Sequence, residues 1–90
     1  MPRYFFHVDD GSERRDTEGT ELAGMGQVRS EAVRLTGEIL RDMGGRFWDH
    51  AAWTLTVTDE TGADVLSLHV SGNELGAAPP AAPSHSGRAS

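Results

Sequence analysis

The chain begins with Met1-Pro2-Arg3-Tyr4-Phe5-Phe6-His7-Val8 and continues at once with Asp9-Asp10-Gly11-Ser12. Alternation in the first run predicts a half-buried strand, and the second run predicts a tight turn. We therefore expect a β-hairpin whose short, charged return strand occupies residues 13–17. The core face of the first strand would carry Tyr4, Phe6 and Val8, and its opposite face Arg3, Phe5 and His7.

An amphipathic helix is predicted to follow the hairpin. From Leu22 to Met43, apolar residues recur every three or four positions, which is the spacing of one helix face. Gly24 and Gly26 weaken its first turn, since a glycine inside a helix costs about 1 kcal/mol relative to alanine. We expect the regular helix at residues 26–43, with a glycine of the Gly44-Gly45 pair ending it in the left-handed conformation.

Two further strands are predicted at residues 52–58 and 64–70, separated by an Asp-Glu-Thr-Gly turn. The order β-β-α-β-β predicts an α+β fold, a two-layer sandwich of a four-stranded sheet with one amphipathic helix on one face. We expect strand order 2-1-4-3, because it places the two most apolar strands in the middle. The residues expected to be buried are Val28, Leu35, Ile39, Trp53, Leu55, Leu66 and Leu68.

Composition limits the kind of protein. Residues 1–75 would form a single small domain, and the Ala-, Pro- and Ser-rich residues 76–90 a disordered tail. The chain has no cysteine, which excludes disulfides and thiolate chemistry. Its net charge of −6 disfavours binding to nucleic acid. Without an apolar leader or membrane-spanning run, the expected location is the cytoplasm and no membrane partner is expected.

Several segments resemble a family of small bacterial proteins known only as a domain of unknown function. They are the opening Met1–Gly11, the Asp16–Leu22 segment, the Ser30–Arg34 part of the helix and the Trp53–Gly62 hairpin. The resemblance covers about residues 1–71 and departs from the family pattern at residues 23–26. It implies no established activity, cofactor or catalytic residue.

Catalytic and metal-binding roles have weak support in the sequence. His7 with Asp9 and Asp10 has the chemistry of a metal site, but turn aspartates normally cap their own backbone. A triad of Asp49 and His50 with Ser67 or Thr54 is disfavoured, because no serine stands in a nucleophile elbow. We expect no metal and no cofactor.

Pro2 supports the alternative function, a small enzyme of tautomerase type. Removal of Met1 would leave a proline amine at the N-terminus, and tautomerases of similar size use such a proline as a general base. The predicted strand turns directly into a hairpin, whereas tautomerases of that superfamily continue from strand to helix. We therefore rank this activity second.

The favoured function is a non-catalytic module for protein interaction or self-association, with a homodimer or an unidentified protein as partner. The helix covers one face of the sheet and leaves the other face, or a strand edge, available. With the expected strand order, His7 and His69 would be neighbours, Phe5 would be an apolar anchor, and association would weaken below about pH 6. The candidate interaction face consists of Phe5, His7, Thr54, Thr56, Val65, Ser67 and His69.

Overall fold

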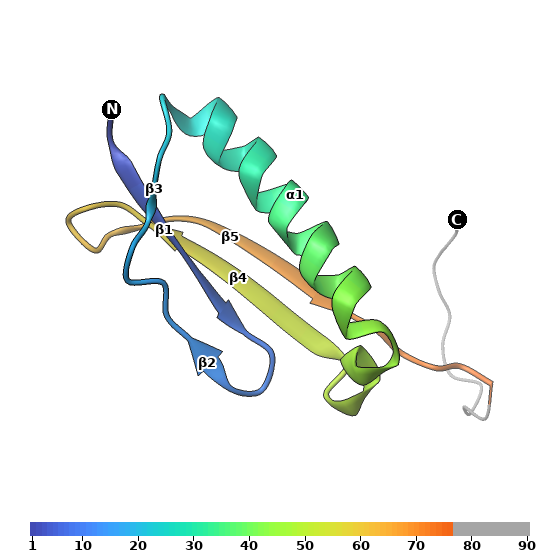
Figure 1. The fold of residues 1–90 in the computed structure, drawn as a ribbon. Helices are drawn as coiled ribbons and strands as arrows, with labels where there is room; N and C mark the ends of the chain where they lie inside the picture. The colour runs from blue at the N-terminus through green and yellow to red at the C-terminus, as the bar shows by residue number, and fades with distance from the viewer. Residues whose placement is uncertain (77–90) are drawn as a thin grey trace.

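The hairpin at the start of the chain is present in the computed structural model, which describes residues 1–76 (Figure 1). Strand β1 (Arg3–Asp9) turns back through Gly11, whose φ is 109°, into β2 (Glu13–Arg14). The expected return strand at residues 13–17 is wrong in length. After Arg14 the chain leaves β1 and pairs with it again in a separate short strand, β3 (Thr20–Glu21).

The sheet has the order β2-β1-β4-β5, with β3 also paired to β1, and every pairing is antiparallel. Strand β4 (Ala52–Thr58) therefore lies between β1 and β5 (Asp64–Ser71). The expected order 2-1-4-3 is wrong, because it put residues 64–70 beside β1. Those two strands run in the same direction, so they could have been neighbours only as a parallel pair. With β4 in the middle, all neighbours are antiparallel.

Helix α1 (Met25–Met43) begins one residue before the expected start. The side chain of Gln27 accepts a hydrogen bond from the backbone N–H of Ala23 at 2.8 Å, which ties the residue before the N-cap Gly24 to the first turn. The helix ends at Gly44, one of the two glycines expected to end it, and its φ of 54° is positive, but its ψ of −128° lies outside the left-handed helical region that was predicted. A short 3-10 helix, η1 (Gly44–Asp49), follows and leads into β4.

The core lies between α1 and one face of the sheet. Among the strands, β4 makes the main contact with α1, and it supplies three side chains with no exposed surface. Because α1 lies over the central strand, the inward side chains of the outer strand β5 are only half-buried. Of the residues expected to be buried, Val28, Trp53 and Leu55 are fully buried, whereas Leu35, Ile39, Leu66 and Leu68 are half-buried. The buried cluster consists of Tyr4, Phe6, Val8, Val28, Ala32, Trp53, Leu55 and Val57.

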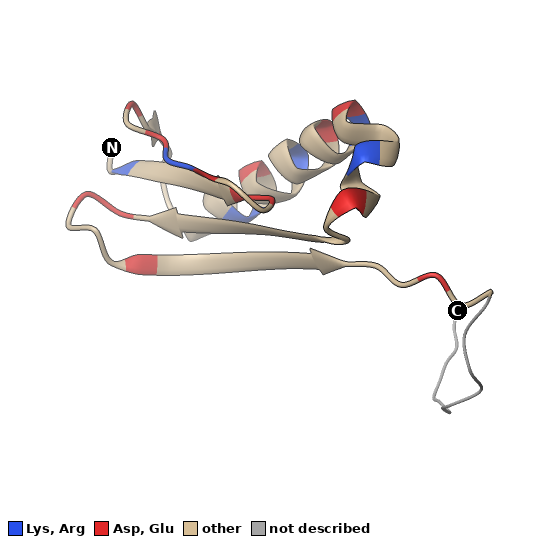
Figure 2. Cartoon of the chain, turned by 90° about the horizontal axis from the view of Figure 1, so that it is seen from below, with Lys and Arg blue, Asp and Glu red and all other residues tan. Residues whose placement is uncertain are grey.

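Charged residues are unevenly distributed over the fold. Figure 2 shows them on α1, along the β1–β2 hairpin and in the turns, whereas β4 and β5 carry only Asp64, at the start of β5. Within residues 1–76, no helix combines the length and apolar character that crossing a bilayer requires. Apart from Gly76, the tail predicted at residues 76–90 lies outside the described residues.

Candidate interaction surface

The face of the sheet opposite α1, here called the outer face, contains most of the residues predicted to form an interface. The β1–β4 and β4–β5 registers arrange them in rows across three strands. Ser67 and His69 are exposed, Thr54, Thr56 and Phe5 are half-buried, and His7 is buried. One row contains His7, Thr56 and Ser67, and the next contains Asp9, Thr54 and His69.

His7 and His69 are not neighbours, so the predicted histidine pair is wrong. His7 is opposite Thr56, His69 is opposite Thr54, and the whole of β4 separates their strands. The Oγ1 atom of Thr54 lies 2.8 Å from Nδ1 of His69. The proposed loss of self-association near pH 6 depended on two adjacent histidines and has no geometric basis in this sheet.

His7 is held in one tautomer by the contacts of its two ring nitrogens. Its Nδ1 accepts a hydrogen bond from the backbone N–H of Asp16 at 3.1 Å, so Nδ1 carries no proton. The proton of the neutral ring is therefore on Nε2, which lies 3.0 Å from Oγ1 of Thr58. A ring in this state cannot take a proton from the Thr58 hydroxyl at Nε2. Both side chains are less than a tenth exposed.

The carboxylate of Asp16 completes the edge of β1 where no strand pairs with it. It accepts backbone hydrogen bonds from Phe6 at 3.1 Å and from Glu18 and Gly19 at 3.0 Å each. Burial raises the pKa of Asp16, but these three donors lower it by more, so its pKa lies below the usual range. Asp16 thus joins β2 to β3 and replaces a missing carbonyl.

Phe5 is less available than an apolar anchor would be. A Cβ atom at Gly19 would lie 2.9 Å from the Phe5 ring and 2.8 Å from the Arg3 side chain, and Gly19 has a φ of 75°. The loop before β3 therefore crosses close to Phe5, and only glycine fits at the crossing. Val65 is also half-buried and packs against the buried cluster, next to the register shift at Val57 and Thr58.

The acidic residues of the first turn have structural partners. Oδ1 of Asp9 accepts the Gly11 backbone N–H at 3.0 Å, as expected of a turn aspartate, and Asp10 pairs with Arg14 at 2.9 Å. Across residues 1–76, no three His, Asp or Glu side chains come together in a way that could hold a metal ion. Pro2 is exposed, and its carbonyl accepts the Leu22 N–H at 3.1 Å.

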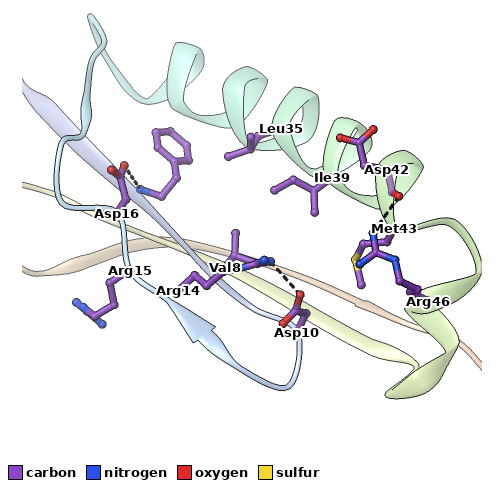
Figure 3. Close-up of a pocket in the computed structure, with 11 residues that line it drawn as sticks. Val8, Asp10, Arg14, Arg15, Asp16, Leu35, Ile39, Asp42, Met43 and Arg46 are labelled. Carbon is purple, nitrogen blue, oxygen red and sulfur yellow. Dashed lines mark hydrogen bonds and ion pairs between the residues drawn. The ribbon is translucent and has the colours of Figure 1, made fainter.

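A groove of about 450 Å³ lies between α1 and the β1–β2 hairpin (Figure 3). Apolar and charged side chains line it in similar measure, and most of the charged side chains have partners within the chain. Arg14 pairs with Asp10, Arg15 pairs with Glu13, and Arg46 donates to the Asp42 carbonyl at 3.2 Å. Sequence reasoning did not identify this groove. The apolar residues that line it are Phe6, Val8, Leu35, Ile39 and Met43.

The free edge of β5, here called the β5 edge, is the clearest unpartnered feature. Because the Phe6 N–H bonds to Asp16, Phe6 points its backbone groups away from β4. Alternation along the ladders then directs the backbone of Val57 and Leu66 toward each other. Gly72 is an even number of residues after Leu66, and its N–H likewise points toward the β4 side, where it donates to the Ala51 carbonyl at 3.0 Å. The N–H and C=O groups of Ser67 and His69 consequently point outward from the sheet.

The β5 edge has one of the usual protections against pairing, a register shift at Val65 near its start, and lacks the others. Edge strands are normally short, or carry lysine, arginine, proline or a bulge that prevents another strand from adding. Strand β5 is eight residues long, and its one charged residue is Asp64 at the start. The opposite edge of the sheet is closed by β2, Asp16 and β3. The absence of basic residues and proline from residues 64–71 was visible in the sequence and could have identified this edge.

A small apolar hollow lies beside the end of β5. It has a volume of about 210 Å³ and is lined by Leu40, Gly44, Phe47, Trp48 and Val70. Trp48 is 49% exposed, although its ring packs edge-to-face on Phe47 with centroids 5.3 Å apart. A Cβ atom at Gly72 would lie 2.8 Å from Trp48, so the indole lies directly over the chain where it leaves β5.

Comparison with curated proteins and with solved structures gave no match. A family described as Domain of unknown function (DUF6894) matches residues 3–71, which run from the start of β1 to the end of β5. The match includes the hairpin, the Asp16 loop, α1 and the β5 edge. The chain is therefore a member of the DUF6894 family.

Proposed function

We propose that this protein is a non-catalytic interaction module that binds another protein strand along the β5 edge. The observation that carries the proposal is the free edge itself, which has no lysine, arginine or proline and directs the backbone groups of Ser67 and His69 outward. Addition of a strand to such an edge is a recurring mode of peptide and protein recognition, in which backbone hydrogen bonds provide the affinity.

The distribution of charge supports a protein partner over nucleic acid. The net charge is −6, and the surface of β4 and β5 next to the edge is almost without charge (Figure 2). An acidic protein repels phosphate backbones, whereas an uncharged edge gives a neutral strand no electrostatic penalty. The proposal takes the cytoplasm as the compartment, as the sequence suggested.

The tautomerase alternative receives less support from the geometry. A proline that acts as a general base needs an apolar pocket around its amine. Pro2 is exposed and lines neither the groove beside α1 nor the hollow beside the end of β5. If Pro2 were catalytic, purified protein without Met1 would convert an enol to its keto form and a Pro2→Ala variant would not.

The test is capture of proteins from a lysate of the source organism by the parent chain and two variants. Ser67→Pro removes an outward N–H from the β5 edge without removing a hydrogen bond to β4, and edge positions tolerate proline. Ser67→Ala is the matched control, because it keeps the N–H. We expect the parent and Ser67→Ala to retain the same proteins and Ser67→Pro to lose them. Retention of the same proteins by all three would refute binding at this edge.

A further inference from the structure

We infer that the partner strand is β5 of a second copy of this chain, paired antiparallel about a two-fold axis. The inference rests on the proposed function above and specifies the partner. The two sheets would join into one, with β5 beside β5 at the centre. Because the axis is perpendicular to the sheet, both α1 helices would lie on the same side.

The backbone of β5 is complementary to itself when Leu68 lies on the two-fold axis. Ser67 and His69 direct their N–H and C=O groups outward. Each can therefore form a hydrogen-bonded pair with a residue of the second copy whose backbone groups also point outward. Placing Leu68 on the two-fold axis pairs Ser67 of each copy with His69 of the other. Both pairs then form their two backbone hydrogen bonds without any change in the β4–β5 ladder.

The register shift at the start of β5 limits how far this pairing extends. Val57 is opposite Leu66 and Thr58 is opposite Asp64, so Val65 is an extra residue with no partner in β4. The regular part of the strand begins at Leu66. With Leu68 on the axis, the paired segment runs from Leu66 to Val70 of each copy and leaves Asp64 outside it.

The apolar side chains of β5 are also complementary in this register. Leu68 would meet Leu68, and Leu66 would meet Val70 of the second copy, on the side that α1 leaves incompletely covered. All three are half-buried in one chain and pack against its core. Val70 lines the hollow of about 210 Å³ beside the exposed Trp48, so Leu66 of the second copy would approach that hollow. The two-fold axis repeats this contact.

A dimer of acidic chains requires a contact surface with little charge. Each copy carries a net charge of −6, and most of the charged residues lie on α1, the β1–β2 hairpin and the turns (Figure 2). The β5 edge is the part of the sheet boundary with the fewest charges, with Asp64 at one end. Joining two such edges keeps the carboxylates of the two copies apart.

The first measurement is sedimentation equilibrium of the full chain at micromolar to millimolar concentration. We expect the parent and Ser67→Ala to approach twice the chain mass of 9.7 kDa and Ser67→Pro to remain at that mass. Circular dichroism of Ser67→Pro must match the parent, because an unfolded variant would also be monomeric. A parent that stays monomeric at all concentrations would overturn the inference.

Disulfide trapping tests the register without relying on the proline variant. The chain has no cysteine, so Ser67→Cys and His69→Cys each introduce a single thiol. In the inferred register, a Ser67→Cys chain mixed with a His69→Cys chain places two thiols across a pair whose Cα atoms lie about 5.5 Å apart, within disulfide range. Either variant alone offers only a diagonal separation of about 7–8 Å, which is too long.

We expect oxidised glutathione to produce a covalent dimer in the mixture and little in either variant alone. Equal cross-linking in all three samples, or none in the mixture, would overturn the inferred register. Failure of the inference is distinguishable from failure of the proposed function. A monomeric parent whose captured proteins are still lost in Ser67→Pro would reject self-pairing and leave strand addition at the β5 edge in place.

Discussion

The Asp16 carboxylate accepts hydrogen bonds from the backbone N–H groups of Phe6, Glu18 and Gly19. The Asp16 N–H in turn fixes His7. Asp16→Ala removes the acceptor of three amides at once, and we expect it to lower the free energy of unfolding by about 2–4 kcal/mol. Urea denaturation measures this loss. The control is Glu18→Ala, because hydrogen bonds to Glu18 use only its backbone.

The same residue predicts a dependence of stability on pH. The pKa of Asp16 is lower in the folded chain than in the unfolded chain, where it is about 3.9. The contribution of ionised Asp16 to the free energy of unfolding is therefore complete above about pH 4–5 and is lost as the pH falls through the pKa of the folded chain. Melting temperatures between about pH 7 and pH 3 should fall less steeply for Asp16→Asn than for the parent. Parallel curves would contradict this role.

Trp53 is fully buried, and its Nε1 has no hydrogen-bond partner among the described residues. A buried donor without an acceptor costs about 1–3 kcal/mol, which offsets part of the gain from burying the ring. Trp53→Phe should therefore cost less than about 1.5 kcal/mol, whereas Trp53→Ala should cost about 3–5 kcal/mol. Thermal unfolding of both variants tests the difference. A similar loss in both would mean that the indole N–H is satisfied.

At the scale of elements, α1 is defined by its apolar face, and this face was readable from the sequence. Leu35 is half-buried against the core, whereas Val33 is 63% exposed. Leu35→Ala should cost about 2 kcal/mol, near the lower end for such substitutions, because the site is only partly enclosed. Val33→Ala should change stability by less than about 0.5 kcal/mol. Equal losses would invalidate the assignment of the helix face.

Other elements could not be derived from local pattern. Alternation correctly placed Tyr4, Phe6 and Val8 in the core, but the two-residue strand β3 is too short to have a period. The role of Asp16 was equally hidden, because its partner Phe6 lies ten residues away. His7 was expected on an accessible face, yet the segment that contains Asp16 buries it. Each failure involves a contact between segments that local periodicity does not encode.

At the scale of the whole molecule, the strand order was the main error and it changed the candidate surface. Apolar content suggested that residues 64–70 would be central, but the centre belongs to β4, where Trp53, Leu55 and Val57 have no exposed surface. The antiparallel direction of the neighbours decides the order, and direction follows from the connections between elements. Moving β5 to the outside separated the two histidines and created the free edge.

The final prediction concerns how much of the chain the fold requires. The hydrogen bonds, ion pairs and buried cluster described above all lie within residues 1–76, and the family match ends at Ser71. Residues 77–90 contain three prolines and one charged residue, Arg88. Deletion of Ala77–Ser90 should therefore shift the melting temperature by less than about 4 °C, equivalent to less than about 1 kcal/mol for a domain of this size. It should also leave the dimer intact, because β5 ends at Ser71.

Differential scanning calorimetry and sedimentation equilibrium of the truncated chain test both expectations. A larger drop would mean that residues beyond 76 contact the domain, and a stable but monomeric truncation would mean that they take part in self-association.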